Sequence, residues 1–305
     1  MRLIDAITTY VGLKQSMGMR FHGAHAILTA FQRQAGDVDV AAVSTAVVAA
    51  FLQPHGPLTA TWLHKHRSLR LFYQHWITRG LVTHSPMPTT VPRVPESFIP
   101  HIYSDEELRR LLAGVAANQT RKGCTIAALT FRTLLLLLYG TGLRLGEALA
   151  LRREDVDLPA GMILIRDTKF YKSRSLPVGP RLTQVLAESI ETVPVGRGPL
   201  PTAFFVNRRG DRLPLHTVWA NFDVLRARVG VQGRLHDLRH TFAVHRLLAW
   251  YREGADVQHC LPHLSTYLGH ARIACTQRYL TMIPELLEHA SQRFETYARS
   301  EARHE

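Results

Sequence analysis

The sequence predicts a mainly α-helical protein with a small β-sheet (α+β), divided into two domains. Apolar residues recur at helical spacing over most of the chain, two short runs have the character of β-strands, and five prolines fall between residues 84 and 100. Proline fixes φ and lacks a backbone donor, so the proline-rich stretch predicts an extended linker. We therefore expect a helical domain over residues 1–83, a linker over 84–101 and a second domain over 102–305.

Four helices are expected in the first domain, because apolar residues recur there every three or four positions. They are predicted at Leu3–Gln15, Ala24–Gln34, Val40–Leu52 and Trp62–Ile77. Four basic side chains of the last helix and its end could either face DNA or be solvated: Lys65, Arg67, Arg70 and Arg79.

The second domain is predicted to begin with a helix through Leu112, since Ser104 and Glu107 have the spacing of a capping box. Further helices are expected at Phe131–Tyr139, ended by Gly140 and Gly142, and at Glu147–Leu151. Two strands, Met162–Ile165 and Ser175–Val178, are predicted to pair as a hairpin, with Pro177 placing the second at a sheet edge. The remaining chain is expected to be mostly helical to about residue 297.

The charge of the chain favours a polyanionic partner. The net charge is +13 and the pI is near 10.2, with nine Lys and Arg against three Asp and Glu in residues 1–95 and 28 against 21 in residues 96–305. Nucleic acid is the usual partner of such a protein, and both domains could touch phosphate. The three widely spaced cysteines are expected to be reduced thiols in a cytoplasmic protein. No apolar run is long enough to span a bilayer, so no membrane partner is expected.

Arg144 is a candidate phosphate ligand because it follows a glycine-rich turn and precedes a helix. Free amide donors and the positive end of the helix dipole favour an anion there. Arginine can also hold a phosphate through two parallel hydrogen bonds. Glu147, three residues later, could orient the guanidinium, and a purely structural Arg–Glu pair is the alternative.

His236 and Arg239 are three residues apart, which places both on one face of a helix. Histidine can exchange a proton near neutral pH, and arginine supplies a fixed positive charge. We therefore expect the pair to hold one phosphate. His240 and His245 are expected on other faces, as packing or surface residues.

The candidates nearest the C-terminus are His270, which follows Gly269, and Tyr279, nine positions later in a helical pattern. Tyrosine is most often a core residue, and only the neighbouring motifs favour a nucleophilic role. Tyr251 and Tyr267 are the competing tyrosines.

Lys169 lies between the two predicted strands, where a hairpin tip can extend an ammonium group into a groove. Such a lysine could protonate a leaving oxygen. A solvated loop lysine is the alternative, and Lys172 is the rival candidate.

Taken together and in this order, the motifs resemble the tyrosine recombinase (phage integrase) family over roughly residues 104–296. The matching residues are Arg144, Lys169, His236-x-x-Arg239, Gly269-His270 and Tyr279. The hairpin tip departs from the family in having Thr168 and Phe170 where glycines often flank the lysine. The first domain is similar to the family's core-binding (SAM-like) DNA-binding domain in position and character.

The resemblance implies a site-specific DNA recombinase or integrase that cuts and rejoins duplex DNA. Tyr279 would attack the scissile phosphate and form a 3′-phosphotyrosyl bond. Arg144, Arg239 and His270 would stabilise the pentavalent phosphate, His236 would assist proton transfer on the nucleophile, and Lys169 would be the general acid for the 5′-oxygen. No cofactor or metal is implied. The segment containing His259, Cys260 and His263 lacks the second pair of ligands that a zinc site requires.

The resemblance also implies a C-shaped, two-domain clamp around a double-stranded recombination site. A homotetramer on two DNA sites, with or without a partner recombinase, is the implied assembly for a phage, plasmid or other mobile element. The amphipathic tail over residues 284–305 could dock on a neighbouring protomer or on its own domain. A type IB topoisomerase, a telomere resolvase and a catalytically silent DNA-binding regulator are the alternatives.

Overall fold

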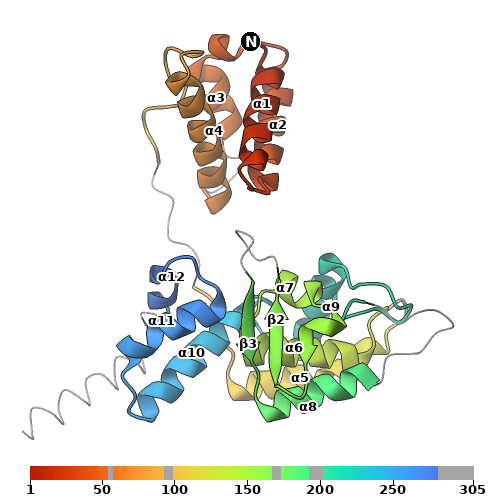
Figure 1. Cartoon of the computed structure of the whole chain (residues 1–305). Helices are drawn as coiled ribbons and strands as arrows, with labels where there is room; N and C mark the ends of the chain where they lie inside the picture. The colour runs from red at the N-terminus through yellow and green to blue at the C-terminus, as the bar shows by residue number, and fades with distance from the viewer. Residues whose placement is uncertain (54–57, 93–98, 167–172, 192–201, 281–305) are drawn as a thin grey trace, which may run out of the picture. The chain divides into compact units, whose positions relative to one another are not determined.

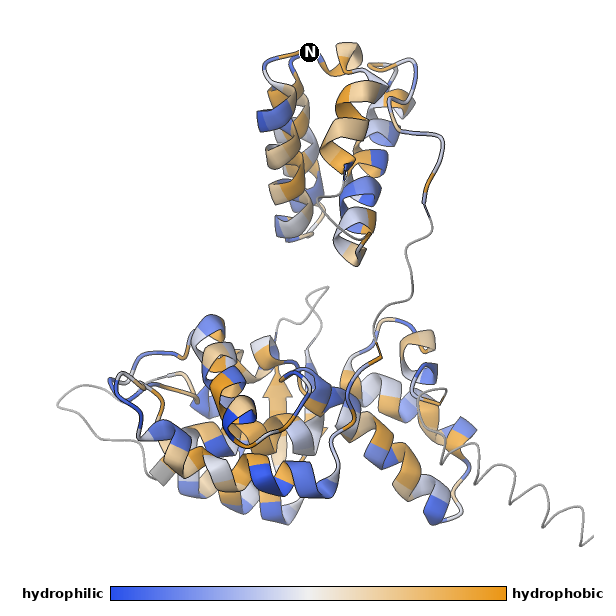
Figure 2. Cartoon of the chain, turned by 180° about the vertical axis from the view of Figure 1, so that it is seen from behind, coloured by the Kyte–Doolittle hydropathy of each residue, from blue (hydrophilic) through white to orange (hydrophobic). Residues whose placement is uncertain are grey.

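The computed structural model of the chain describes residues 1–53, 58–92, 99–166, 173–191 and 202–280. The fold is mainly helical with one small sheet, which confirms the predicted α+β class (Figure 1). The chain separates into two compact units, Met1–Phe98 and Ile99–Glu305, each with its own hydrophobic core. Most helices carry both hydrophobic and hydrophilic residues, as expected when one face of each is buried (Figure 2). None of the helices in the described ranges has the length and apolar character needed to cross a membrane.

The first unit is a bundle of helices α1 (Leu3–Ser16), α2 (His22–Ala35), α3 (Thr45–Leu52) and α4 (Ala60–Thr78). Helix α2 packs on α1, α3 and α4, so it lies at the centre of the bundle. Its Phe31 is fully buried and makes edge-to-face contacts with Phe51 of α3 and Tyr73 of α4. Aromatic contacts of this kind add to the stability gained from burying apolar area.

The single helix expected at Val40–Leu52 is wrong, because the structure has a 3₁₀ turn at Val40–Ala42 followed by α3. The Asp39 side chain accepts a hydrogen bond from the backbone amide of Ala41, which closes the short turn. Val43 and Ser44 then have extended backbone angles, and α3 begins after Ser44. Serine favours such N-terminal flanking positions over the helix interior, and this preference outweighs the continuous apolar pattern.

The second unit is built around α6 (Ala128–Thr141), the central buried helix. Four other helices form the surrounding bundle: α5 (Asp105–Gln119) and α8 (Pro180–Glu191) pack on it, as does α10 (Asp237–Arg252), while α9 (Leu215–Arg228) packs on α5. The predicted capping box at the start of α5 is confirmed, since the Ser104 hydroxyl accepts from the Glu107 amide and the Glu107 carboxylate accepts from the Ser104 amide. Helix α11 (Val257–Leu268) packs on α10, and the short α12 (Ala274–Gln277) packs on α11.

The sheet of the second unit has three antiparallel strands in the order β1 (Val156–Asp157), β2 (Met162–Ile165) and β3 (Arg174–Pro177). Strand β2 has the predicted bounds, and β3 is at the sheet edge, as Pro177 indicates. Ile163 pairs with Leu176, and both side chains are buried in the core that contains the leucines of α6. The sheet therefore covers one side of the helical core (Figure 1).

Helix α6 ends at Gly142, which has a left-handed backbone with φ of +62°. This turn directs the chain into α7 (Leu145–Ala150), whose first flanking residue is Arg144. A Cβ atom at Gly142 would lie 2.6 Å from Phe242 Cδ1 and 2.7 Å from Leu268 Cδ2. Both the backbone angle and the close packing of α10 and α11 therefore require glycine at this position.

We predict that Gly142→Ala destabilises the second unit by roughly 2–4 kcal/mol, because it combines left-handed strain with overpacking. Denaturant unfolding of the full chain measures this effect. Gly146→Ala is the matched control, since Gly146 lies within α7 and a Cβ there meets no atom within 4 Å. The control is expected to be neutral or slightly stabilising. Equal stability of the two variants would contradict this account of Gly142.

Candidate active site

The candidate site forms where the ends of α6 and α11 meet the start of α10. Arg239 of α10 is only 3% exposed, and its guanidinium donates to the carbonyl oxygens of Gly142 at 2.6 Å and Leu268 at 2.8 Å. These two carbonyls belong to helix C-termini, which carry partial negative charge. Arg239 thus ties together two helix ends that are 126 residues apart in the chain, counted from Gly142 to Leu268.

Burial, followed by the positive charge of Arg144, lowers the pKa of Arg239 to about 10. A guanidinium with this pKa is still a cation at neutral pH. Because its carbonyl partners are neutral, most of its positive charge is left for an anion that enters the site.

Arg144 is placed at the same junction by α7 and by the turn after α11. Its guanidinium donates to Glu147 Oε1 at 2.8 Å and to the carbonyl of Gly269 at 3.4 Å. The Glu147 carboxylate also accepts from the backbone amide of Arg144 at 3.2 Å. The contact expected between Arg144 and Glu147 is therefore present, and it holds the arginine at the start of the helix.

Arg174 of β3 is a second partner of Glu147 that sequence reasoning missed. Its Nη2 lies 2.8 Å from Glu147 Oε2, and its Nε donates to the carbonyl of Tyr267 at 3.1 Å. Gly269 has φ of +67°, and a Cβ atom there would lie 2.8 Å from the Arg174 guanidinium. Arg174 therefore fastens the edge strand to α7 and to the end of α11. Only its place in the predicted hairpin could have suggested this role.

Glu147 is a buried carboxylate between two arginines. Burial alone would raise its pKa, but hydrogen bonding and charge from Arg174, followed by the charge of Arg144, lower the pKa below the usual glutamate value. Glu147 is consequently ionised at neutral pH, and its single negative charge is smaller than the combined positive charge of the arginines around it.

His270 and Tyr279 come from the segment after α11. The His270 Nδ1 atom lies 2.8 Å from the hydroxyl of the fully buried Thr276, and the rings of His270 and Tyr279 stack with centroids 6.3 Å apart. Tyr279 is 3% exposed. Burial raises its pKa, although the charges of Arg239 and Arg144 and a hydrogen bond from Arg239 act in the opposite direction. The phenol therefore keeps its proton at neutral pH.

His240 lies beside Tyr279 and His236, so the expectation that it lies on another face of the helix is wrong. Its Nδ1 atom lies 3.1 Å from the Tyr279 hydroxyl oxygen. Its ring also makes a perpendicular contact with that of His236, at 5.0 Å between centroids. The sequence does contain a signal for this position, because His236 and His240 are four residues apart. Residues four apart lie on the same face of a helix, as residues three apart do.

The histidines of the site are neutral at pH 7. Burial lowers the pKa of both His240 and His270 to about 4, and nearby positive charges act in the same direction. Burial and Arg239 also lower the pKa of His236. Neutral imidazoles between two arginines can donate a hydrogen bond to one oxygen and accept a proton from another.

Lys169 and its rival Lys172 lie outside the described residues, as does the tail over residues 284–305. Strand β2 ends at Ile165 and β3 begins at Arg174, so the described strands flank the segment that contains both lysines. Across the described residues, no three His, Cys, Asp or Glu side chains gather as metal ligands would.

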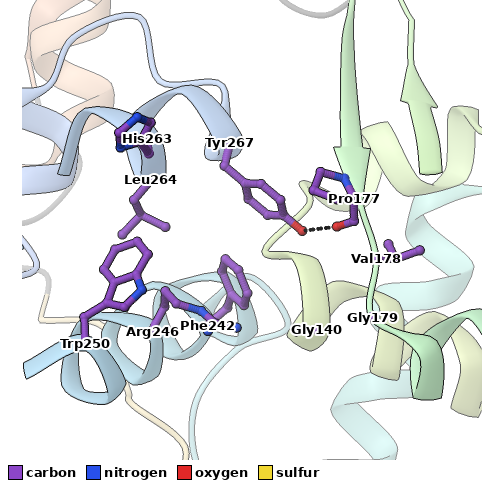
Figure 3. A pocket seen from close by; sticks show the side chains of 10 residues that line it. All are labelled: Gly140, Pro177, Val178, Gly179, Phe242, Arg246, Trp250, His263, Leu264 and Tyr267. Atoms are coloured by element: carbon purple, nitrogen blue, oxygen red, sulfur yellow. Dashed lines mark hydrogen bonds between the residues drawn. The ribbon is translucent and has the colours of Figure 1, made fainter. Parts of the chain in front are cut away.

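A separate pocket of about 320 Å³ lies between β3 and helices α10 and α11 (Figure 3). Phe242, Trp250 and Leu264 line it, and Tyr267 donates a hydrogen bond to the carbonyl of Pro177 at its side. None of the candidate site residues described above lines this pocket. Its walls are mostly apolar, with Arg246 and His263 also lining it, whereas the arginine–histidine cluster gathers several phosphate-binding groups; the candidate active site is therefore that cluster.

Comparison with known proteins identifies relatives of the chain. Residues 104–285 match the model of the phage integrase family. The chain is 34% identical to a putative integrase/recombinase of Sinorhizobium fredii over 95% of this chain and 94% of the relative. It is 31% identical to the tyrosine recombinase XerC of Staphylococcus carnosus, over 75% and 73% respectively. A lambda integrase tetramer bound to a Holliday junction shares the fold, with a TM-score of 0.66 and 17% identity over 89% of this chain and 78% of that one.

We predict that Glu147→Gln destabilises the protein by roughly 3 kcal/mol at pH 7, because it leaves Arg174 without its buried anionic partner. The folded-state pKa of Glu147 is lowered, so its contribution is present above the usual glutamate pKa and is lost as pH falls through the folded value. Unfolding of wild type and variant between pH 3 and pH 8 measures the difference. A difference independent of pH would contradict the ion-pair explanation.

Proposed function

Because this chain belongs to the phage integrase family, and is accordingly a DNA breaking and rejoining enzyme of site-specific recombination, we propose that its active site is the cluster of Arg144, His236, Arg239, His270 and Tyr279. Lys169 completes the proposed set. The observation that carries this proposal is the burial of the Tyr279 hydroxyl beside Arg239, where Arg144, His240 and His270 also gather.

In the proposed reaction, the Tyr279 oxygen attacks a backbone phosphate and displaces the 5′-oxygen of the next nucleotide. A 3′-phosphotyrosyl bond forms as the P–O5′ bond breaks, so the phosphodiester is conserved and can be resealed without ATP. The pentavalent phosphate gains one negative charge during the attack. Fixed positive groups aimed at that charge lower the barrier without reorganising, and this is the task of Arg144 and Arg239.

His270 and Lys169 have two further roles in the proposed reaction. His270 is held through Nδ1 by Thr276, so its Nε2 atom is the one that can meet a phosphate oxygen. Lys169 is the proposed general acid for the 5′-oxygen, on the family resemblance alone, since it lies outside the described residues. The tyrosine shares its site with arginines of the same chain, which supports cleavage by each protomer's own nucleophile.

The proposed partner is a double-stranded recombination site of a phage, plasmid or other mobile element. The excess of basic residues in both parts of the chain supports contact of both units with DNA. Assembly as a homotetramer on two sites is also proposed, because the structural neighbour described above is a tetramer on a Holliday junction. Size measurement of protein mixed with one or two sites tests the tetramer, and a monomer on each site would contradict it.

We predict that wild-type protein forms a covalent adduct at the 3′ end of a nicked suicide substrate in the absence of metal, and that Tyr279→Phe forms none. The site is obtained from DNA flanking the gene or by selection. Tyr267→Phe is the matched control, because its hydroxyl bonds only to the Pro177 carbonyl in the described structure. The control is expected to form the adduct at a rate close to that of wild type.

An adduct that survives in Tyr279→Phe would move the nucleophile to another residue. Adduct formation with relaxation of supercoils, but without exchange between paired sites, would identify a topoisomerase. Tight binding to the site without any cleavage would favour a silent regulator.

We also predict that DNA affinity falls steeply with salt, because each phosphate neutralised by Lys or Arg releases a counterion. With six to ten phosphate contacts, the affinity falls by about 10³–10⁵ between 50 and 200 mM salt. Fluorescence anisotropy with a labelled duplex measures the slope. A flat response would contradict extensive contact with the backbone.

A further inference from the structure

We propose that His240 is a catalytic residue that takes the proton from the Tyr279 hydroxyl during cleavage and returns it during rejoining. The family resemblance gives proton transfer on the nucleophile to His236 instead. This inference rests on Tyr279 being the nucleophile, as proposed above.

The geometry of the pair meets the requirement for proton transfer. His240 Nδ1 and the Tyr279 hydroxyl oxygen are 3.1 Å apart, within the range of about 2.6–3.2 Å over which a general base can act. The two rings are tilted by 57° with centroids 5.6 Å apart. His240 is held on the first turns of α10 next to Arg239, whose guanidinium is fixed by two carbonyls. The histidine therefore lies next to a residue that is fixed by two hydrogen bonds.

His236 has a different position. It precedes α10, it is more exposed than His240, and its ring contacts the ring of His240 edge-on. Among the hydrogen bonds of the described residues, His240 contacts the Tyr279 hydroxyl and His236 does not. His236 thus borders the entrance of the site, where it can meet the DNA, while His240 reaches the buried phenol.

The protonation states of His240 and Tyr279 suit a general base and its proton donor. Burial is the largest cause that lowers the pKa of His240 to about 4, so the imidazole is neutral and able to accept a proton at pH 7. Burial raises the pKa of Tyr279, so the phenol needs an acceptor when it attacks. The charged or titratable groups that face His240 are His236, Asp237, Arg239, Arg234, His270 and Tyr279.

Binding of the phosphate raises the proton affinity of His240, as a general base requires. A phosphodiester carries one negative charge, and its pentavalent form carries two. That charge offsets the field of Arg239, which disfavours the imidazolium. The proton affinity of His240 therefore rises as the bond to phosphorus forms.

The proposed step is balanced. The Tyr279 O–P bond forms and the P–O5′ bond breaks, the phenolic proton moves to His240 Nδ1, and the 5′-oxygen receives a proton from a separate acid, proposed to be Lys169. In rejoining, the 5′-hydroxyl attacks the phosphotyrosine and gives its proton back to the separate acid, the P–O bond to Tyr279 breaks, and the His240 imidazolium returns its proton to the departing phenol oxygen. His240 consequently acts in both cleavage and rejoining.

The chain contains a matched control on the same helix. His245 Nδ1 lies 3.0 Å from the hydroxyl of Tyr139, so it forms a histidine–tyrosine pair of nearly equal geometry outside the site. Burial likewise lowers the pKa of His245. His240→Gln and His245→Gln each remove one imidazole from such a pair, and only the first removes a base from the nucleophile.

The first test measures single-turnover adduct formation by the full chain on the suicide substrate between pH 6 and pH 9, together with DNA affinity and melting temperature. His240→Gln is expected to slow adduct formation by about 10²-fold or more at pH 7, while His245→Gln cleaves as wild type does. The rate of His240→Gln is expected to rise about tenfold per pH unit, because the phenol must now ionise before it attacks. The wild-type rate is expected to stay nearly flat. A rate for His240→Gln equal to that of wild type, or a parallel pH profile, would overturn the proposal.

The second test separates the base from the acid. In a substrate with sulfur at the bridging 5′ position, the leaving group departs without a proton. Lys169→Ala is then expected to regain most of its rate, and His240→Gln to remain slow. Rescue of His240→Gln by sulfur would place His240 on the leaving-group side and contradict its role as the base.

Failure of this inference is distinguishable from failure of the proposed function. If His240→Gln cleaves normally and Tyr279→Phe forms no adduct, only the role of His240 is rejected. An adduct from wild type that persists in Tyr279→Phe rejects the nucleophile, and with it both proposals.

Discussion

The buried guanidinium of Arg239 holds together two helix ends, and the positions of the other site residues depend on them. Burial of a cation costs several kcal/mol unless other groups compensate. The carbonyls of Gly142 and Leu268 do so from the negative ends of α6 and α11. From the first of these ends the chain turns into Arg144, and from the second it continues to His270. The Arg239 side chain thus sets the distance between the segment that carries Arg144 and the segment that carries His270.

Burial is the main reason why the histidines are neutral. It is the largest cause that lowers the pKa values of His240 and His270 to about 4, and the charge of Arg239 lowers both further toward that value. Glu147 lies between Arg144 and Arg174 and compensates only part of their positive charge. In the proposed mechanism, a bound phosphate offsets the field of Arg239, so that substrate binding favours proton acceptance through electrostatics.

Local sequence patterns were sufficient to predict the elements of the fold, but they do not predict its tertiary contacts. The capping box at Ser104, the bounds of β2 and the edge position of β3 follow from short-range preferences and are confirmed. The break before α3 was missed because the apolar pattern runs through it. Arg174 and His240 were missed because their partners, Glu147 and Tyr279, lie 27 and 39 residues away and meet them only after the chain folds. The roles assigned to the site residues remain proposals.

The proposed nucleophile follows a helix of four residues, Ala274–Gln277. So short a helix has almost no stability of its own in water. The place of Tyr279 therefore depends on tertiary contacts. These are the hydrogen bonds of Thr276 with His270 and of the phenol with His240, and the packing of Tyr279 in the hydrophobic cluster formed by α10 and α11. In the proposed mechanism, loss of the two hydrogen bonds would misplace the nucleophile, while the helices around α6 keep a core of their own.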